Sequence, residues 1–220
     1  MQNFDTTAPI AAVLDIPAGH VQFIAADRAD TTVEVRPSDA SKSRDVKLAE
    51  RTTVEYADGV LRIHAETKNQ IFGSSGAIEV TVQLPAGSRV EAKAAAADLR
   101  GVGRFGDVTL EVAAGDIKVD EVGSARLTTQ AGDVTVGRLN GSAEVSTAKG
   151  DIRIAEAVGG TVVLRTQAGD VSVGAAPGVS ASLDAGTTLG RIENSLKNTG
   201  ATELTIKATT TVGDITAHSL

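Results

Sequence analysis

The sequence contains no cysteine and no tryptophan, and its aromatic residues are four phenylalanines and one tyrosine among 220 positions. Without cysteine, the chain forms no disulfide, no thiolate nucleophile and no cysteine-ligated metal site. With so few aromatics, the core must be built from Val, Ile, Leu and Ala, whose small side chains suit thin and regular layers. The chain also lacks the aromatic stacking platforms on which single-strand nucleic-acid binders depend.

Positive charge and long apolar runs are scarce as well. The formal net charge is −7, and an acidic chain repels phosphate backbones, which argues against nucleic-acid binding. No apolar run reaches the ~18 residues of a membrane span. The segment from Met1 to Thr7 has neither the basic nor the apolar region of a secretory signal, and we therefore expect a cytoplasmic protein.

A short phrase recurs through the second half of the chain: Gly-Asp followed by Val or Ile at alternate positions. Complete copies begin at Gly115, Gly132, Gly150, Gly169 and Gly213. Two copies are degraded, because Ala97-Asp98-Leu99 lacks the glycine and Gly190-Arg191-Ile192 lacks the aspartate. The phrase marks a repeat of about 18 residues, typical of repeat architectures.

Each repeat has the pattern of a strand, a tight turn and a second strand. The glycine suits a corner that needs a positive φ, and the aspartate carboxylate can bond a backbone N–H two residues on. One such unit cannot bury its own apolar face, so the repeats must stack. The sequence thus predicts an all-β protein with a parallel β-solenoid, similar to a single-stranded β-helix, over residues 89–220. The predicted inward side chains are Ile117, Val134, Ile152 and Val171, and the outward ones between strand positions are Lys118, Thr135, Arg153 and Ser172.

Residues 1–88 alternate like strands but lack the repeat. The expected strands are Ala11–Ile16, His20–Ala26, Thr31–Arg36, Thr52–Tyr56, Val60–Ala65 and Ala77–Leu84, with polar loops over Pro37–Asp45 and Lys68–Gly76. Asp58-Gly59 is a typical hairpin turn. The segment Leu84–Ser88 is the expected boundary of this N-terminal β-rich part, which forms either an antiparallel cap or irregular first coils of the same solenoid.

The order of these motifs resembles a known family. A strand ending in Leu84-Pro85-Ala86-Gly87-Ser88 precedes repeated Ser/Thr-x-x-Gly-Asp-Val/Ile-x-Val phrases. This order is similar to the bacterial β-strand-repeat family DUF4097, which carries the label "putative adhesin". The resemblance covers nearly the whole chain. It implies a β-strand-repeat fold and brings no catalytic residue with it.

The corner aspartates are the strongest candidates for chemistry. Asp98, Asp116, Asp133, Asp151 and Asp170 should stack along one edge, as a calcium-binding ladder would. However, calcium β-rolls repeat a longer glycine-rich motif every nine residues and supply several oxygens to each ion, so we interpret the aspartates as turn formers. The histidines lie far apart, and no metal-binding or nucleophile motif occurs. We therefore expect no enzyme activity, metal or cofactor.

Two functions remain open. The first is a structural or interaction protein that associates with itself, end to end as a dimer or polymer, or with another protein. The second is a binding module for a protein or small ligand at the junction of the N-terminal part and the coils. The predicted contact residues are the apolar pair Ile71 and Phe72, in a polar loop, and Leu204, Ile206 and Ile215, at what should be the uncovered C-terminal end of the stack.

Overall fold

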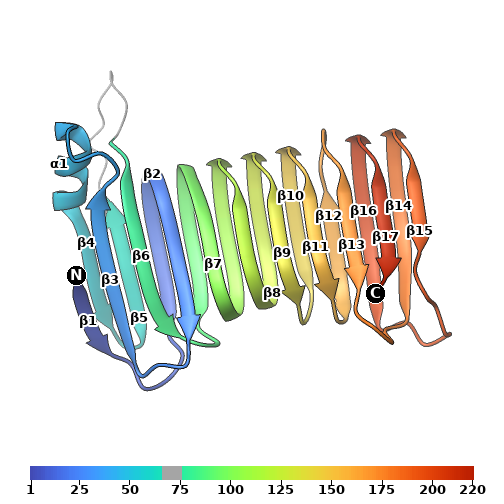
Figure 1. The fold of residues 1–220 in the computed structure, drawn as a ribbon, viewed down its shortest axis with the longest axis horizontal. Coiled ribbons are helices and arrows are strands. Elements are labelled where there is room, and N and C mark those ends of the chain that lie inside the picture. Colours follow the sequence, from blue (N-terminus) through green and yellow to red (C-terminus); the bar gives the residue numbers. More distant parts are fainter. Residues whose placement is uncertain (66–75) are drawn as a thin grey trace. The chain divides into compact units, whose positions relative to one another are not determined.

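Strands make up nearly all of the regular structure in the computed structural model, which describes residues 1–65 and 76–220 (Figure 1). The chain divides into two compact units, Met1–Gly115 and Asp116–Leu220. The predicted boundary at residues 88/89 falls inside the first unit, because β7 (Arg89–Ala114) runs parallel to β2 (Ala11–Ala26) and pairs with it along most of its length. The chain is mostly β and its strand pairs are largely parallel.

The N-terminal unit combines parallel and antiparallel strand pairs. Strand β2 is paired in parallel with β5, β6 and β7. The pairs β1–β3, β3–β6 and β4–β5 are antiparallel. The remaining strands of this unit are β1 (Gln2–Asp5), β3 (Asp30–Pro37), β4 (Thr52–Ala57), β5 (Val60–Ala65) and β6 (Ile78–Pro85).

The N-terminal unit also contains a short helix and an aromatic pair. The helix α1 (Ser43–Arg51) was not predicted, because nine residues with few apolar side chains give no convincing helical period. Leu48 of α1 is buried, and Asp45 accepts the backbone N–H of Ala77 at 3.1 Å. Phe4 of β1 and Tyr56 of β4 place their rings 5.4 Å apart.

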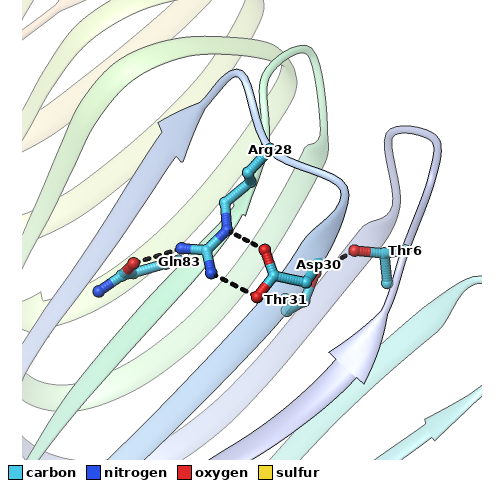
Figure 2. Close-up of polar contacts among 5 residues, drawn as sticks. All are labelled: Thr6, Arg28, Asp30, Thr31 and Gln83. Atoms are coloured by element: carbon cyan, nitrogen blue, oxygen red, sulfur yellow. Dashed lines mark hydrogen bonds and ion pairs between the residues drawn. The ribbon is translucent and has the colours of Figure 1, made fainter.

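A polar cluster holds the turn between β2 and β3 (Figure 2). The Arg28 guanidinium donates from Nε and Nη2 to both carboxylate oxygens of Asp30, each at 2.9 Å, and from Nη1 to Gln83 of β6. Nearby, the buried hydroxyls of Thr6 and Thr31 are 2.8 Å apart. The bidentate geometry fixes the orientation of the arginine, so the cluster ties the turn to β6.

The C-terminal unit contains ten strands, among which every pairing is parallel. In chain order they are β8 (Ile117–Ala131), β9 (Val134–Leu139), β10 (Ala143–Lys149), β11 (Ile152–Ala157), β12 (Gly160–Arg165), β13 (Val171–Ala175), β14 (Ala181–Leu189), β15 (Ile192–Ser195), β16 (Leu204–Val212) and β17 (Ile215–Ser219). One row of paired strands follows the order β8, β9, β11, β13, β17 and β15. The other follows β8, β10, β12, β16 and β14. We call two strands joined by one glycine corner a coil.

The predicted inward positions of this unit are confirmed, and two of the four predicted outward positions are exposed while the other two are half-buried. Ile117, Val134, Ile152 and Val171 are neighbours in the strand register and are each at most 1% exposed. In the same strands, Lys118 and Arg153 are exposed. These four residues form one column of branched side chains along the stack, which we call the core column, and further buried columns, such as that of Leu127 and Val145, lie beside it. This regular stacking of branched side chains explains how the unit packs with so few aromatics.

The corner glycines are required by the close spacing of the coils. Gly150 has a φ of +143°, and a Cβ atom there would lie 2.0 Å from the carbonyl oxygen of Gly132. Gly169 and Gly213 have the same relation to the corner before them in the stack, also at 2.0 Å. Only glycine combines this backbone conformation with this approach.

Candidate interaction surface

The corner aspartates form a continuous chain of hydrogen bonds between coils. In each case Oδ1 accepts the backbone N–H of the corner residue on the next coil, at 2.7–2.8 Å. The chain runs through Asp116, Asp133, Asp151, Asp170 and Asp214 in that order. The carboxylate thus joins neighbouring coils, a role that the interpretation as a simple turn former does not include.

This chain of hydrogen bonds ends at Arg191, the degraded copy of the repeat. The Arg191 N–H donates to Asp214 Oδ1 at 2.8 Å, and its guanidinium donates to Oδ2 at 3.0 Å. The N–H and guanidinium of Arg191 hold the pKa of the Asp214 carboxyl below its usual value. An arginine at this corner supplies no carboxylate that could bond a further coil.

The threonines beside the corners complete the same motif. The hydroxyls of Thr147, Thr166 and Thr210 donate to the carbonyls of Gly132, Gly150 and Gly169 at 3.1–3.3 Å. The corner aspartate and threonine side chains therefore both bond one coil to the next.

The last strands in sequence are not the last in the stack. Strands β16 and β17 lie between the coil of β12 and β13 and the coil of β14 and β15 (Figure 1). The prediction that Leu204, Ile206 and Ile215 lie at an uncovered end is therefore wrong. Their side chains are at most 1% exposed, because a coil covers them on each side. The chain passes over one position, forms β14 and β15, and then returns to fill the gap.

The last coil in the stack consists of residues 181–195, and we call it the terminal coil. Among the residues that the structure describes, β14 pairs only with β16, and β15 pairs only with β17. Ile192 occupies the core column next to Ile215 but is 45% exposed, against 1% for Ile215. At its corner, Leu189 and Val212 are neighbours in register and are 65% and 48% exposed. Apolar surface and free strand edges thus coincide.

The loop after β15 covers only one end of the terminal coil. The N–H of Ala181 donates to the carbonyl of Lys197 at 3.0 Å, and the N–H of Thr199 donates to the Ser180 hydroxyl at 3.0 Å. Further along β14, Leu183 is only half-buried. Residues 196–200 thus give partial cover, and the remainder of both strand edges stays open.

The other candidate residues do not gather into a site. His20 lies 3.2 Å from Asp98 and His64 lies 3.6 Å from Asp15, each as an exposed pair. Over residues 1–65 and 76–220, no group of three or more His, Asp or Glu side chains is placed to hold a metal ion. Ile71 and Phe72 lie outside the described residues. No helix in the described part of the chain has the length and apolar character needed to cross a membrane.

The chain is similar to solved structures of low sequence identity, one of which has a TM-score above 0.5 and shares the fold. A "putative adhesin" from Bacteroides fragilis is 12% identical with a TM-score of 0.51, and the match covers 98% of this chain and 95% of that one. A "putative cell adhesion protein" from Clostridium sporogenes is 11% identical with a TM-score of 0.49, covering 100% and 98%. A "putative adhesin" from Parabacteroides distasonis is 13% identical with a TM-score of 0.47, covering 98% and 95%.

No curated protein matches the sequence. The family model described as Toastrack DUF4097 matches residues 13–219, which include all of the Gly-Asp corners. This is the family that the repeated phrases resemble. Because the match spans nearly the whole sequence, the chain belongs to the Toastrack DUF4097 family.

Proposed function

We propose that the chain is a non-enzymatic interaction protein, a solenoid of stacked coils that associates with a second copy of itself through the terminal coil. The observation that carries the proposal is the exposure of Ile192. Ile215, Val171 and Ile192 occupy equivalent positions in neighbouring coils. The side chains of Ile215 and Val171 are at most 1% exposed, whereas that of Ile192 is 45% exposed. Solenoids normally close such an end with a polar cap, and one more layer of strands would bury this side chain.

The distribution of exposed apolar side chains also favours the terminal coil as the contact surface. Five large apolar residues are exposed in the described part of the chain, and three of them, Leu189, Ile192 and Val212, lie in the terminal coil or directly beside it. Exposed strand edges pair readily with other strands. An apolar patch flanked by open edges is therefore suited to a protein partner rather than to a small polar ligand.

The non-enzymatic part of the proposal rests on the sequence. It contains no cysteine, and no G-x-S-x-G or H-E-x-x-H motif occurs in it. The Bacteroides fragilis protein that shares the fold is described as a "putative adhesin", which agrees with a role in binding, although a fold by itself does not determine function.

The test is the mass of the protein in solution at tens of micromolar, measured by light scattering after size exclusion. The unmodified chain should have twice the 22.4 kDa mass of one chain. Ile192→Lys should be monomeric, because it places a charge in the proposed contact. The control Thr128→Lys adds the same charge on an exposed position of β8 and should remain dimeric. A monomeric unmodified chain, or an Ile192→Lys variant that dimerises normally, would contradict the proposal.

A further inference from the structure

The corner of the terminal coil differs from the Gly-Asp corners of the same unit. In those corners the aspartate carboxylate reaches the N–H of the next corner in the stack. At the terminal coil Gly190 is followed by Arg191, whose N–H and guanidinium both donate back to Asp214, at 2.8 and 3.0 Å. The side chain of this corner therefore bonds the coil already beside it.

The coil of β16 and β17, which we call the inserted coil, separates two coils that are in register with each other. Val171 of β13 neighbours Ile215, and Ile215 neighbours Ile192 of β15. In the other row, β12 and β14 pair with the same residues of β16. Without the inserted coil between them, Val171 and Ile192 would meet directly, with no shift along either strand and with one apolar side chain on another.

The linkers on both sides of the terminal coil allow two orders of stacking. Residues 140–142 and 158–159 are enough to join neighbouring coils earlier in the unit, and the linkers 176–180 and 196–203 are longer. The chain can therefore reach the observed order, in which the inserted coil lies inside the terminal coil. It can also reach a sequential order, in which the terminal coil stacks on β12 and β13 and the inserted coil lies outermost.

The hydrogen bonds at the corners distinguish these two orders. In the observed order Asp170 accepts the N–H of Asp214 at 2.7 Å, and Asp214 accepts the N–H of Arg191 at 2.8 Å. In the sequential order Asp170 would accept the N–H of Arg191, and the N–H of Asp214 would face an arginine, which has no acceptor. The observed order thus keeps one more hydrogen bond to a carboxylate, together with the bond from the guanidinium.

We propose that Arg191 selects the observed order of the last two coils and so determines which coil ends the stack. The sequential order would uncover Leu204, Ile206 and Ile215, each at most 1% exposed in the structure. It would also end at Asp214, whose carboxylate could accept the N–H of a further coil. With Arg191 outermost, the stack ends at a corner that offers no such acceptor. This inference goes beyond the proposed self-association, and its test does not require two copies.

The absence of cysteine allows each order to be detected with a pair of introduced thiols. Neighbouring strands lie about 4.8 Å apart, within the disulfide range of about 4.4–6.8 Å between Cα atoms, whereas strands two positions apart, at about 9.6 Å, cannot be bridged. Ser172 neighbours Thr216 in the observed order and would neighbour Glu193 in the sequential order. Ser172→Cys with Thr216→Cys therefore reports the observed order, and Ser172→Cys with Glu193→Cys reports the sequential one. Thr216→Cys with Glu193→Cys is adjacent in both orders and reports folding of the two coils.

Each pair is prepared with Arg191 present, with Arg191→Asp and with the control Arg165→Asp. Arg191→Asp removes the guanidinium, supplies the acceptor that the sequential order lacks, and places a second carboxylate beside Asp214 in the observed order. Arg165→Asp makes the same change at another exposed arginine, which pairs with Glu144 at 3.1 Å. Each variant is refolded from urea in dilute solution under reducing conditions and then oxidised, and the disulfides within single chains are measured by mass spectrometry of peptides.

With Arg191 present, the disulfide between positions 172 and 216 should form and that between positions 172 and 193 should not. Arg191→Asp should raise the ratio of the second disulfide to the first by about tenfold or more, as expected for one hydrogen bond to a charged group. Arg165→Asp should leave the ratio unchanged.

Three results would overturn the inference. The first is a ratio that Arg191→Asp does not change, or that Arg165→Asp changes equally. The second is a disulfide between positions 172 and 193 that forms as readily as the other when Arg191 is present. The third is loss of the disulfide between positions 193 and 216 in Arg191→Asp, because the arginine would then hold the two coils together in any order rather than select one.

Discussion

Replacing Gly150 with alanine tests whether the glycine corners set the stability of the C-terminal unit. The added Cβ would lie 2.0 Å from the Gly132 oxygen and 2.6 Å from the Gly132 carbon, so the backbone of one coil must move away from the next. The neighbouring Asp133 Oδ1, which accepts the Asp151 N–H at 2.8 Å, would lie 3.0 Å from the new atom. The substitution therefore disturbs a hydrogen bond as well as the packing.

The expected loss of stability is the sum of two effects. A residue with a side chain in the left-handed region costs about 1–2 kcal/mol, and forcing an extra carbon into a well-packed site costs about 1–3 kcal/mol. Gly150→Ala should thus lower the free energy of unfolding by roughly 2–5 kcal/mol. For a chain of this size, each kcal/mol shifts Tm by about 2–4 °C, so the decrease should be readily measured.

Two glycines outside the corners separate these effects. Gly178 has a φ of +82°, and a Cβ atom added there would have nothing within 4 Å, so Gly178→Ala should show the conformational cost alone. Gly186 has open space and no positive φ, so Gly186→Ala should be neutral or slightly stabilising. The assay is urea unfolding followed by far-ultraviolet circular dichroism. If Gly150→Ala lost no more stability than Gly178→Ala, the close approach of the coils would not limit stability.

Four further outcomes are expected. Ile152→Asp should unfold or aggregate the protein in a thermal melt while Arg153→Asp melts normally, because Ile152 is 1% exposed and Arg153 points to water; equal melting temperatures would mean a wrong register. Asp151→Ala should lower Tm more than Asp151→Asn, since the amide oxygen can still accept the N–H of the next corner; equal losses would argue against that bond. The Ser41 hydroxyl and N–H lower the pKa of Asp39 to about 2, so stability from this group is present above about pH 4 and is lost as the pH falls toward 2. Asp39→Asn should therefore flatten that part of the Tm profile, and an unchanged slope would count against it. Millimolar calcium should leave Tm unchanged, because each corner carboxylate already accepts a backbone N–H; a rise of several degrees that chelator reverses would refute this.

The corner motif and the strand register could be predicted because they are local and repeated. Alternation of apolar residues after each Gly-Asp pair identified the inward side of Ile152 and the outward side of Arg153, and both are found there. The bond from each aspartate to the next coil was not foreseen. A corner aspartate can accept a backbone N–H of its own turn or one of the next coil, and the sequence is the same in both cases.

The order of the last two coils could not be read from repeat spacing. Residues 176–180 and 196–203 carry the chain past one position in the stack and back again. A usable signal was present at Arg191. A corner without a carboxylate cannot accept the N–H of a following corner, so it belongs at the end of the chain of hydrogen bonds. This reasoning would have placed the coil of Ile192 outermost.

The N-terminal unit was harder to predict because its pairing partners are distant in sequence. The strand positions were mostly expected, but β6 runs parallel to β2 and antiparallel to β3, and no local pattern distinguishes these pairings. The helix α1 depends on tertiary contacts of Leu48 and Asp45 rather than on a periodic sequence.

Residue-level hydrogen exchange along β14 as a function of protein concentration tests the pairing of the terminal coils most directly. Backbone N–H groups of a strand alternate between its two edges, and along β14 those of Leu183, Ala185 and Thr187 face away from β16. If two copies pair edge to edge, these outward amides should become more protected as concentration rises. The amides of Asp184 and Gly186, directed at β16, should keep the same protection throughout. Outward amides that exchange rapidly at every concentration, including tens of micromolar and above, would show that the edge stays open and would contradict the proposed association.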